Sequence, residues 1–220
     1  MNFETIFSLL QQDHQPTMLE QFRHYSAFQQ LIATLVSART KDSITIPLMI
    51  KLFEKHHTPQ DFITLPLAQL QQSLYGIGFY KVKAKHIQQL SKILITRYNS
   101  KVPSTFEELT LLPGVGRKTA NCVLAYTFHQ PVIAVDIHVH RISNRVGWVK
   151  TTTPEETENA LRKIIPKTLW SQVNELLVDH GQRVCQPRKP KCGSCKIKDY
   201  CIYSSNINKQ LAAPPHHTIS

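Results

Sequence analysis

The chain has 220 residues, of which 41% are hydrophobic and 8% aromatic, so it can bury the core of one large domain or of two small ones. Lysine and arginine number 26 against 15 aspartate and glutamate residues, and the net charge of +11 favours a polyanionic partner over a basic surface that binds nothing. Its apolar runs fall far short of the roughly 20 residues that cross a membrane. Since the first residues also lack a secretory signal, we expect no membrane partner and a cytoplasmic protein.

Helix-start signals recur along the chain as a serine or threonine followed three residues later by an acid or a glutamine. They begin at Ser26, Thr58, Ser104 and Thr153. Gly147 and Gly181 are typical of helix ends. The β-branched stretch PVIAVD at 131–136 has no evident strand partner, so the pattern predicts an all-α protein of many short helices.

An internal repeat joins two glycine-containing segments. LYGIGFYKV at 74–82 aligns without gaps with LPGVGRKTA at 112–120, and each segment precedes a predicted helix. The alignment predicts two copies of a helix, a glycine hairpin and a second helix. Tyr80 stands in the first copy where Lys118 stands in the second, so the hairpin itself does not require a lysine at that position.

Four of the five cysteines follow the pattern C-x6-C-x2-C-x5-C; they are Cys185, Cys192, Cys195 and Cys201. In a reducing compartment such a group favours metal ligation over disulfides. The spacing favours an iron–sulfur cluster. Zinc is the alternative, although zinc usually draws on two close pairs of ligands and only Cys192 and Cys195 form one.

The loop between the first two of these cysteines is basic. Its sequence, QPRKPK, contributes Arg188, Lys189 and Lys191. A metal centre would hold these cations on a short covalent loop, where they can contact phosphates; the alternative is an ordinary solvated loop.

Three landmarks in this order resemble the endonuclease III family of DNA glycosylases, in the helix-hairpin-helix superfamily. They are LPGVGRKTA at 112–120, VDIHVHR at 135–141 and the cysteine pattern at 185–201. The resemblance continues upstream through LIATLVSARTKD at 31–42 and YGIGFYKVKAKHI at 75–87, so it covers nearly the whole chain.

The resemblance implies two helical lobes with a DNA-binding cleft between them. One lobe is a helical barrel at residues 22–130, with the helix-hairpin-helix motif at about 104–128. The other combines residues 1–21 with 131–203 and carries a C-terminal [4Fe-4S] cluster loop. Residues 204–220 lack periodicity and are expected to form a disordered tail.

The family's activity implies a bifunctional DNA N-glycosylase and abasic-site lyase in base excision repair, which flips the damaged base out of duplex DNA. By resemblance, Lys118 attacks C1′ and forms a Schiff base, and β-elimination then nicks the strand 3′ to the site. The dipole of the following helix and the adjacent Arg117 are expected to lower the pKa of Lys118. Asp136 is expected to assist loss of the base, although it also suits a helix N-cap.

Besides the basic loop, the expected DNA contacts come from three places. The second hairpin offers backbone N–H groups to a phosphate at Pro113, Gly114, Val115 and Gly116. The positions matching the family's inserted side chains hold Arg39 and Phe79, where glutamine and an aliphatic residue are common. His138 and Arg141 match the family and are expected to face the DNA backbone. His140 replaces a usually apolar residue, so the lesion preference is open among oxidised pyrimidines, the family default, pyrimidine dimers and mismatched bases.

Three other functions compete with this interpretation. A monofunctional glycosylase lacks the lysine, so Lys118 argues against it. A non-catalytic helix-hairpin-helix protein that only grips DNA does not need both Lys118 and Asp136. The third alternative is a zinc-bound nucleic-acid adaptor. The sequence does not indicate an oligomer, so we expect a monomer acting on double-stranded DNA with a damaged base or an abasic site.

Overall fold

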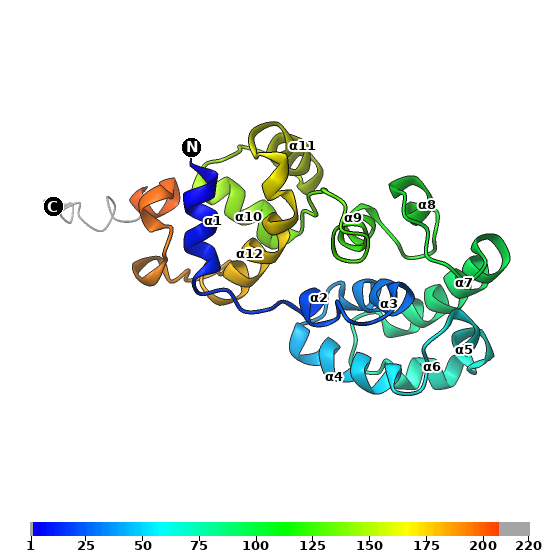
Figure 1. Cartoon of the computed structure of the whole chain (residues 1–220). Coiled ribbons are helices and arrows are strands. Elements are labelled where there is room, and N and C mark those ends of the chain that lie inside the picture. Colours follow the sequence, from blue (N-terminus) through cyan, green and yellow to red (C-terminus); the bar gives the residue numbers. More distant parts are fainter. Residues whose placement is uncertain (1, 207–220) are drawn as a thin grey trace, which may run out of the picture. The chain divides into compact units, whose positions relative to one another are not determined.

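The computed structural model describes residues 2–206, and its regular elements over that range are all helical (Figure 1). It divides the chain into two compact units. The hairpin unit is Pro16–Ala134, and the cluster unit joins Met1–Gln15 to Val135–Ser220. No helix among the described residues is long and apolar enough to cross a membrane.

The hairpin unit is built around one buried helix. Its helices are α2 (Met18–Gln21), α3 (Ala27–Ser37), α4 (Asp42–Phe53), α5 (Pro59–Thr64), α6 (Leu67–Ser73), α7 (Tyr80–Tyr98), α8 (Phe106–Thr110) and α9 (Arg117–Tyr126). Every residue of α3 from Phe28 to Val36 is buried, as expected of a helix that is surrounded by others. α3 contacts α2, α4, α7 and α9, so it forms the centre of the unit (Figure 1).

The cluster unit contains α1 (Phe3–Gln11), α10 (Ile137–Val146), α11 (Pro154–Ile164), α12 (Trp170–Arg183) and three short 3-10 helices at Lys167–Leu169, Cys192–Ser194 and Lys198–Tyr200. α12 packs against α1 and α10, and α10 also packs against α11 (Figure 1). The cysteine-rich segment follows α12 directly.

Three of the four predicted helix starts are confirmed. Ser26, Thr58 and Thr153 each form a capping box with the residue three positions on. The prediction at Ser104 is wrong by one residue. Thr105 caps α8 instead, accepting from the N–H of Glu108 (3.4 Å) and donating to its Oε2 (2.6 Å).

The two predicted glycine stops have different outcomes. Gly147 ends α10 at φ 91°, a left-handed conformation that glycine adopts without strain. Gly181 lies inside α12, so the prediction of a helix end there is wrong. A Cβ at Gly181 would come within 2.6 Å of Nδ1 of His138, so the glycine allows α10 and α12 to approach closely.

The unit boundaries lie a few residues from the expected positions. The hairpin unit begins at Pro16 and ends at Ala134, compared with the expected 22–130. α2 belongs to it because Met18 and Phe22 are buried in its core. Residues 202–206 are helical and Ser204 is buried, so the expected tail does not begin at residue 204; its remainder, 207–220, lies outside the described residues.

Candidate active site and iron–sulfur centre

The second hairpin connects α8 to α9 through a tight turn. The N–H of Val115 donates to the carbonyl of Leu112 (3.0 Å), and Gly114 adopts φ +79°. A Cβ at Gly114 would lie 2.6 Å from Nδ1 of His86, so the turn needs glycine for both its conformation and its packing. Gly116 is the N-cap of α9, and a Cβ there would meet nothing within 4 Å. The backbone at the start of α9 is therefore open to close approach.

Lys118 is the second residue of α9, as the sequence predicted. Its side chain is half-buried, and the helix is buried from Thr119 to Tyr126. Beside it, the guanidinium of Arg117 stacks over the ring of Phe106 at 5.2 Å. In this first turn the helix dipole is positive, so the field that Lys118 experiences disfavours its own positive charge.

The first hairpin has the same construction between α6 and α7. The N–H of Ile77 donates to the carbonyl of Leu74 (3.0 Å), and Gly76 adopts φ +96°. The predicted repeat is therefore confirmed as two helix–hairpin–helix units. They differ at the start of the second helix, where the N-cap of α7 is Phe79, in a left-handed conformation at φ 59°.

Arg39 and Phe79, the two candidate inserted side chains, lie against one another. The guanidinium carbon of Arg39 is 5.5 Å from the centroid of the Phe79 ring. Phe79 is 63% exposed, and Arg39 is also exposed. Both residues have positive φ, 58° and 59°. The structure thus brings together two exposed side chains that come from different loops of the hairpin unit.

Asp136 is the N-cap of α10, as the sequence allowed. Its Oδ1 accepts from the backbone N–H groups of His138 (2.8 Å) and Val139 (2.9 Å). The carboxylate is half-buried, and these capping bonds use one of its two oxygens. Asp136 belongs to the cluster unit and Lys118 to the hairpin unit.

Arg141 is bound within the protein, and its expected contact with the DNA backbone stays a prediction. Its guanidinium donates to the carbonyl of Cys185 through Nε (3.1 Å) and Nη2 (2.9 Å), and Nη2 also donates to the carbonyl of Gly181 (3.0 Å). Nη2 further contacts Nδ1 of His138 at 3.0 Å, and because arginine only donates, that nitrogen accepts. Arg141 therefore ties α10 to α12 and to the first cysteine.

His140 serves a contact between helices. Its Nδ1 lies 2.6 Å from the hydroxyl of Thr157, and that hydroxyl lies 2.6 Å from the hydroxyl of Thr151. A polar chain of hydrogen bonds thus joins α10 to α11. His138 is half-buried, and its proposed contact with DNA stays a prediction.

All four cysteines of the C-terminal pattern line one pocket, together with apolar side chains that include Ile142, Val146 and Ile197. Burial, together with the neighbouring thiols, raises the pKa of Cys195 to about 11. The Cys195 thiol alone would therefore stay protonated at neutral pH, and a positively charged metal centre would convert it into a thiolate ligand.

Four cysteines that line one pocket are a ligand set that either an iron–sulfur cluster or a zinc ion takes in proteins.

Two residues that the sequence did not single out hold this pocket. Arg145 donates from Nη1 to Sγ of Cys185 (3.4 Å) and to the carbonyl of Gln186 (2.7 Å). Nε2 of His180 lies 3.6 Å from Sγ of Cys195. Arg145 follows Arg141 by one helical turn, and this i, i+4 spacing was the available signal that both face the cysteine segment.

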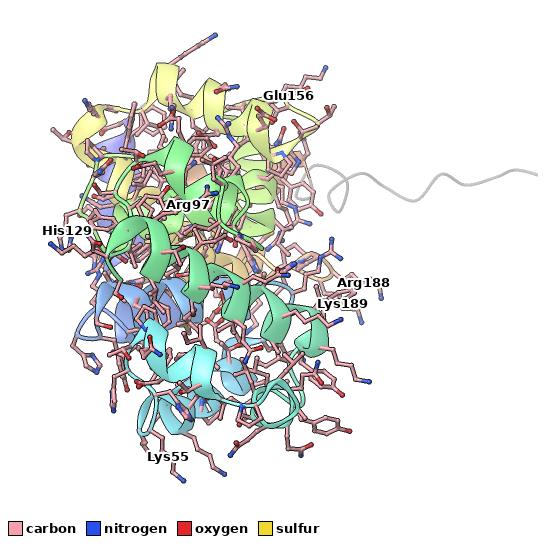
Figure 2. The ribbon with its side chains drawn as sticks, turned by 90° about the vertical axis from the view of Figure 1, so that its right-hand side faces the viewer. Lys55, Arg97, His129, Glu156, Arg188 and Lys189 are labelled. Atoms are coloured by element: carbon pink, nitrogen blue, oxygen red, sulfur yellow. The ribbon has the colours of Figure 1, made fainter. Side chains whose placement is uncertain are left out.

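The basic loop is exposed. Arg188 and Lys189 extend from it away from the ribbon (Figure 2), and Lys191 is also exposed. The N–H of Lys191 donates to the carbonyl of Val184 (3.0 Å), which closes the loop. The three cations are exposed, and their expected contact with phosphates stays a prediction.

Comparison with known proteins identifies the family. Residues 32–167 match the model of the HhH-GPD superfamily of base excision DNA repair proteins, and residues 185–201 match the iron–sulfur binding domain of endonuclease III. Endonuclease III of Thermotoga maritima is 48% identical over 176 residues, which cover 80% of this chain and 83% of that protein. Endonuclease III of Bacillus subtilis is 39% identical over 190 residues, which cover 85% and 86%.

Solved structures agree with this assignment. A trapped endonuclease III–DNA covalent intermediate is 37% identical to the chain and superposes with a TM-score of 0.82, covering 94% of this chain and 99% of that one. These matches confirm the resemblance that the three sequence landmarks carried. The chain therefore belongs to the HhH-GPD superfamily of base excision DNA repair proteins and, within it, to the endonuclease III family.

Proposed function

We propose that Lys118 is the nucleophile with which this DNA glycosylase and abasic-site lyase attacks C1′ of a damaged nucleotide. The new N–C1′ bond forms as the bond to the base breaks, and the base leaves with the electron pair and takes up a proton. Opening of the sugar gives a Schiff base between Nζ and C1′. Loss of a C2′ proton then expels the 3′ phosphate, which nicks the strand. The observation that carries this proposal is the position of Lys118, half-buried in the first turn of α9 directly after the glycine hairpin.

The hairpin supports the proposal by fixing the backbone relative to the amine. The turn at 113–116 is open at Gly116, so a phosphate oxygen can approach the N–H groups at the start of α9. A phosphate held there sets the sugar at a constant offset from Lys118. Because the contact uses only backbone atoms, it does not depend on DNA sequence, as a repair enzyme requires.

Asp136 is proposed to assist departure of the base and to stabilise the positive charge that develops on the sugar. Its Oδ1 is fixed by two backbone N–H groups, which orients the carboxylate without neutralising it. The cap and the proposed catalytic role are compatible because both capping bonds end on the same oxygen, Oδ1.

The remaining proposed DNA contacts are of two kinds: side chains inserted into the duplex and cations that bind phosphates. Arg39 and Phe79 enter the space left by the flipped nucleotide, where the guanidinium can bond the orphaned base and the ring can stack on its neighbours. The loop cations Arg188, Lys189 and Lys191 bind phosphates. The proposed setting is the nucleoid, in the cytoplasm.

The iron–sulfur centre is proposed to be a [4Fe-4S] cluster held by Cys185, Cys192, Cys195 and Cys201. Four thiolates and an apolar pocket fit this group. When bound, the cluster supplies four strong metal–thiolate bonds that shape the basic loop. Arg145 donates a hydrogen bond to Sγ of Cys185 and thereby stabilises thiolate charge.

Borohydride trapping tests the proposal. The wild-type protein is expected to form a covalent adduct with duplexes that contain thymine glycol, an oxidised pyrimidine, or an abasic site. Lys118→Gln should form none while still binding DNA, and the exposed-lysine control Lys101→Gln should behave as wild type. Duplexes with a pyrimidine dimer or a mismatch test the other substrate classes. Absence of a wild-type adduct on every duplex would refute the lyase mechanism.

A further inference from the structure

A buried lysine joins the two loops that carry Arg39 and Phe79. Lys83, in the first turn of α7, is only 7% exposed. Its Nζ donates to the carbonyls of Val36 (2.8 Å) and Ala38 (2.5 Å). These carbonyls lie in the last turn and at the C-cap of α3, where carbonyl groups lack helical partners and the dipole attracts a cation.

The side chain and the backbone of Lys83 each bond to a segment that carries one of the two proposed inserted residues, Arg39 and Phe79. Through its side chain it holds Ala38, the residue before Arg39. Through its backbone it donates to the carbonyl of Phe79 (3.0 Å). Arg39 and Phe79 both occupy the left-handed region, which costs a residue with a side chain about 1 kcal/mol or more and persists only where its surroundings impose it.

A second bond closes the same pair of loops. The N–H of Gly78 donates to Oγ1 of Thr40 (3.1 Å), and a Cβ on Gly78 would lie 3.0 Å from the carbonyl oxygen of Arg39. The loops after α3 and before α7 are thus in contact on either side of the exposed pair. Lys83 and Thr40 supply the polar bonds between them.

Burial makes the positive charge of Lys83 energetically unfavourable. Over residues 2–206 its Nζ is bonded to carbonyl oxygens and has no carboxylate partner. Burial and the nearby Arg39 lower the pKa of Lys83 to about 8. An apolar side chain of the same length would fill the space without this penalty. What the ammonium group adds is a pair of directed bonds to the carbonyls that precede Arg39.

We propose that Lys83 is a positioning residue that presets Arg39 and Phe79 for insertion into damaged duplex DNA. The inference rests on the proposed insertion role of that pair. Both loops are then fixed before DNA binds. The entropy cost of ordering the two side chains therefore does not reduce the binding free energy that drives base flipping. Lys83 itself touches neither the reacting sugar nor the nucleophile in this account.

The test compares Lys83→Met with Lys92→Met, which removes one charge from an exposed position of the same helix. Each variant is trapped on an abasic duplex with 2-aminopurine opposite the lesion, whose fluorescence reports insertion. Lys83→Met is expected to lose the fluorescence change and to slow trapping about tenfold or more, as misplacement of a positioning group does. Lys92→Met should match wild type in both readouts.

Two further arms separate positioning from a general structural role. On single-stranded abasic DNA, which has no opposite base to read, Lys83→Met should trap at the wild-type rate. In a Phe79→Ala background, adding Lys83→Met should change duplex trapping by less than about twofold, because coupled residues are not additive. If Lys83→Met does not fold, Thr40→Val, which removes the bond from Gly78, is expected to give the same pattern.

The outcomes distinguish this inference from the proposed function. If wild type gives no adduct, the lyase mechanism itself fails. If wild type traps and shows the fluorescence change, but Lys83→Met and Thr40→Val keep both, the positioning role is wrong. Equal loss on single-stranded and duplex DNA, or full additivity with Phe79→Ala, also overturns it.

Discussion

The two hairpins of the hairpin unit have nearly the same backbone and different chemistry. Each places a left-handed glycine, Gly76 or Gly114, two residues before another glycine and closes with the same N–H to carbonyl bond. The first leads into Phe79 and Tyr80 and lies beside Arg39; the second leads into Lys118. The comparison teaches that the hairpin provides a fixed position, and that the side chains after the turn determine how that position is used.

The largest expected effect comes from replacing Lys118, the residue that distinguishes the second hairpin from the first. Lys118→Gln should lower the rate of strand nicking by about 10³-fold or more, because removing a nucleophile eliminates the covalent pathway. Single-turnover nicking of an abasic duplex measures it. Adding Tyr80→Lys to this variant places a lysine at the matching position of the first hairpin and should restore nothing. Restored nicking would mean that the two hairpins are interchangeable.

The start of α10 provides a contrast, since it has a capping carboxylate where α9 has Gly116. Asp136→Asn should lower base excision by about 10²-fold or more, because the charge that stabilises the sugar cation is lost. Asparagine caps a helix as well as aspartate, so stability should change by less than about 0.5 kcal/mol. Asp136→Ala should cost about 1 kcal/mol more in unfolding free energy. Intact excision by Asp136→Asn would leave the residue with its capping role alone.

The hairpin turns themselves should differ in their tolerance of a side chain. Gly76→Ala is expected to cost about 1 kcal/mol from its positive φ, since the nearest atom to a Cβ is Ile44 Cγ2 at 4.0 Å. Gly114→Ala should cost about 2–4 kcal/mol, because the new Cβ also clashes with His86. Chemical denaturation measures both. In a His86→Ala background, the unfolding free-energy costs of Gly76→Ala and Gly114→Ala should become similar. If the two costs still differ, the clash with His86 is not the cause of the difference.

A further expected effect is a dependence of stability on pH that comes from Lys83 in α7, the helix after the first hairpin. The pKa of Lys83 is lowered to about 8 by burial and by Arg39, from the usual 10.5. Between these two values the unfolded chain binds more protons than the folded one, so this residue's contribution to stability should rise with pH. The melting temperature of wild type, relative to Lys83→Met, should therefore increase from pH 8 to about 10.5. A flat or falling difference would contradict the lowered pKa.

Local signals predicted much of this molecule. A capping box such as Thr153 with Glu156 is complete within four residues, so it needs no knowledge of the rest of the fold. The repeated glycine spacing and the cysteine pattern are likewise contained in short segments. These signals, together with the family resemblance, predicted the helices, both hairpins and the pocket that the four cysteines line.

Contacts between distant segments could not be read from such signals. Gly181 was predicted to end a helix, but it lies inside α12, where the absence of a Cβ leaves room for the side chain of His138. The sequence did not indicate that Arg141 donates hydrogen bonds to the carbonyl of Cys185, 44 positions away. The sequence did not distinguish Lys83 from the other lysines, because its partners at the end of α3 are more than 40 residues away. In each case the partner is far away in sequence, and only the fold brings it close.

The most direct test of the central claim is to identify the amino group that bonds to DNA. The borohydride-reduced adduct on an abasic duplex is digested with protease and nuclease, and the cross-linked peptide is sequenced by mass spectrometry. We predict a single modified site, Lys118, in the peptide that contains the second hairpin. A cross-link on Lys83, on a loop lysine such as Lys189, or on the N-terminal amine would contradict the account.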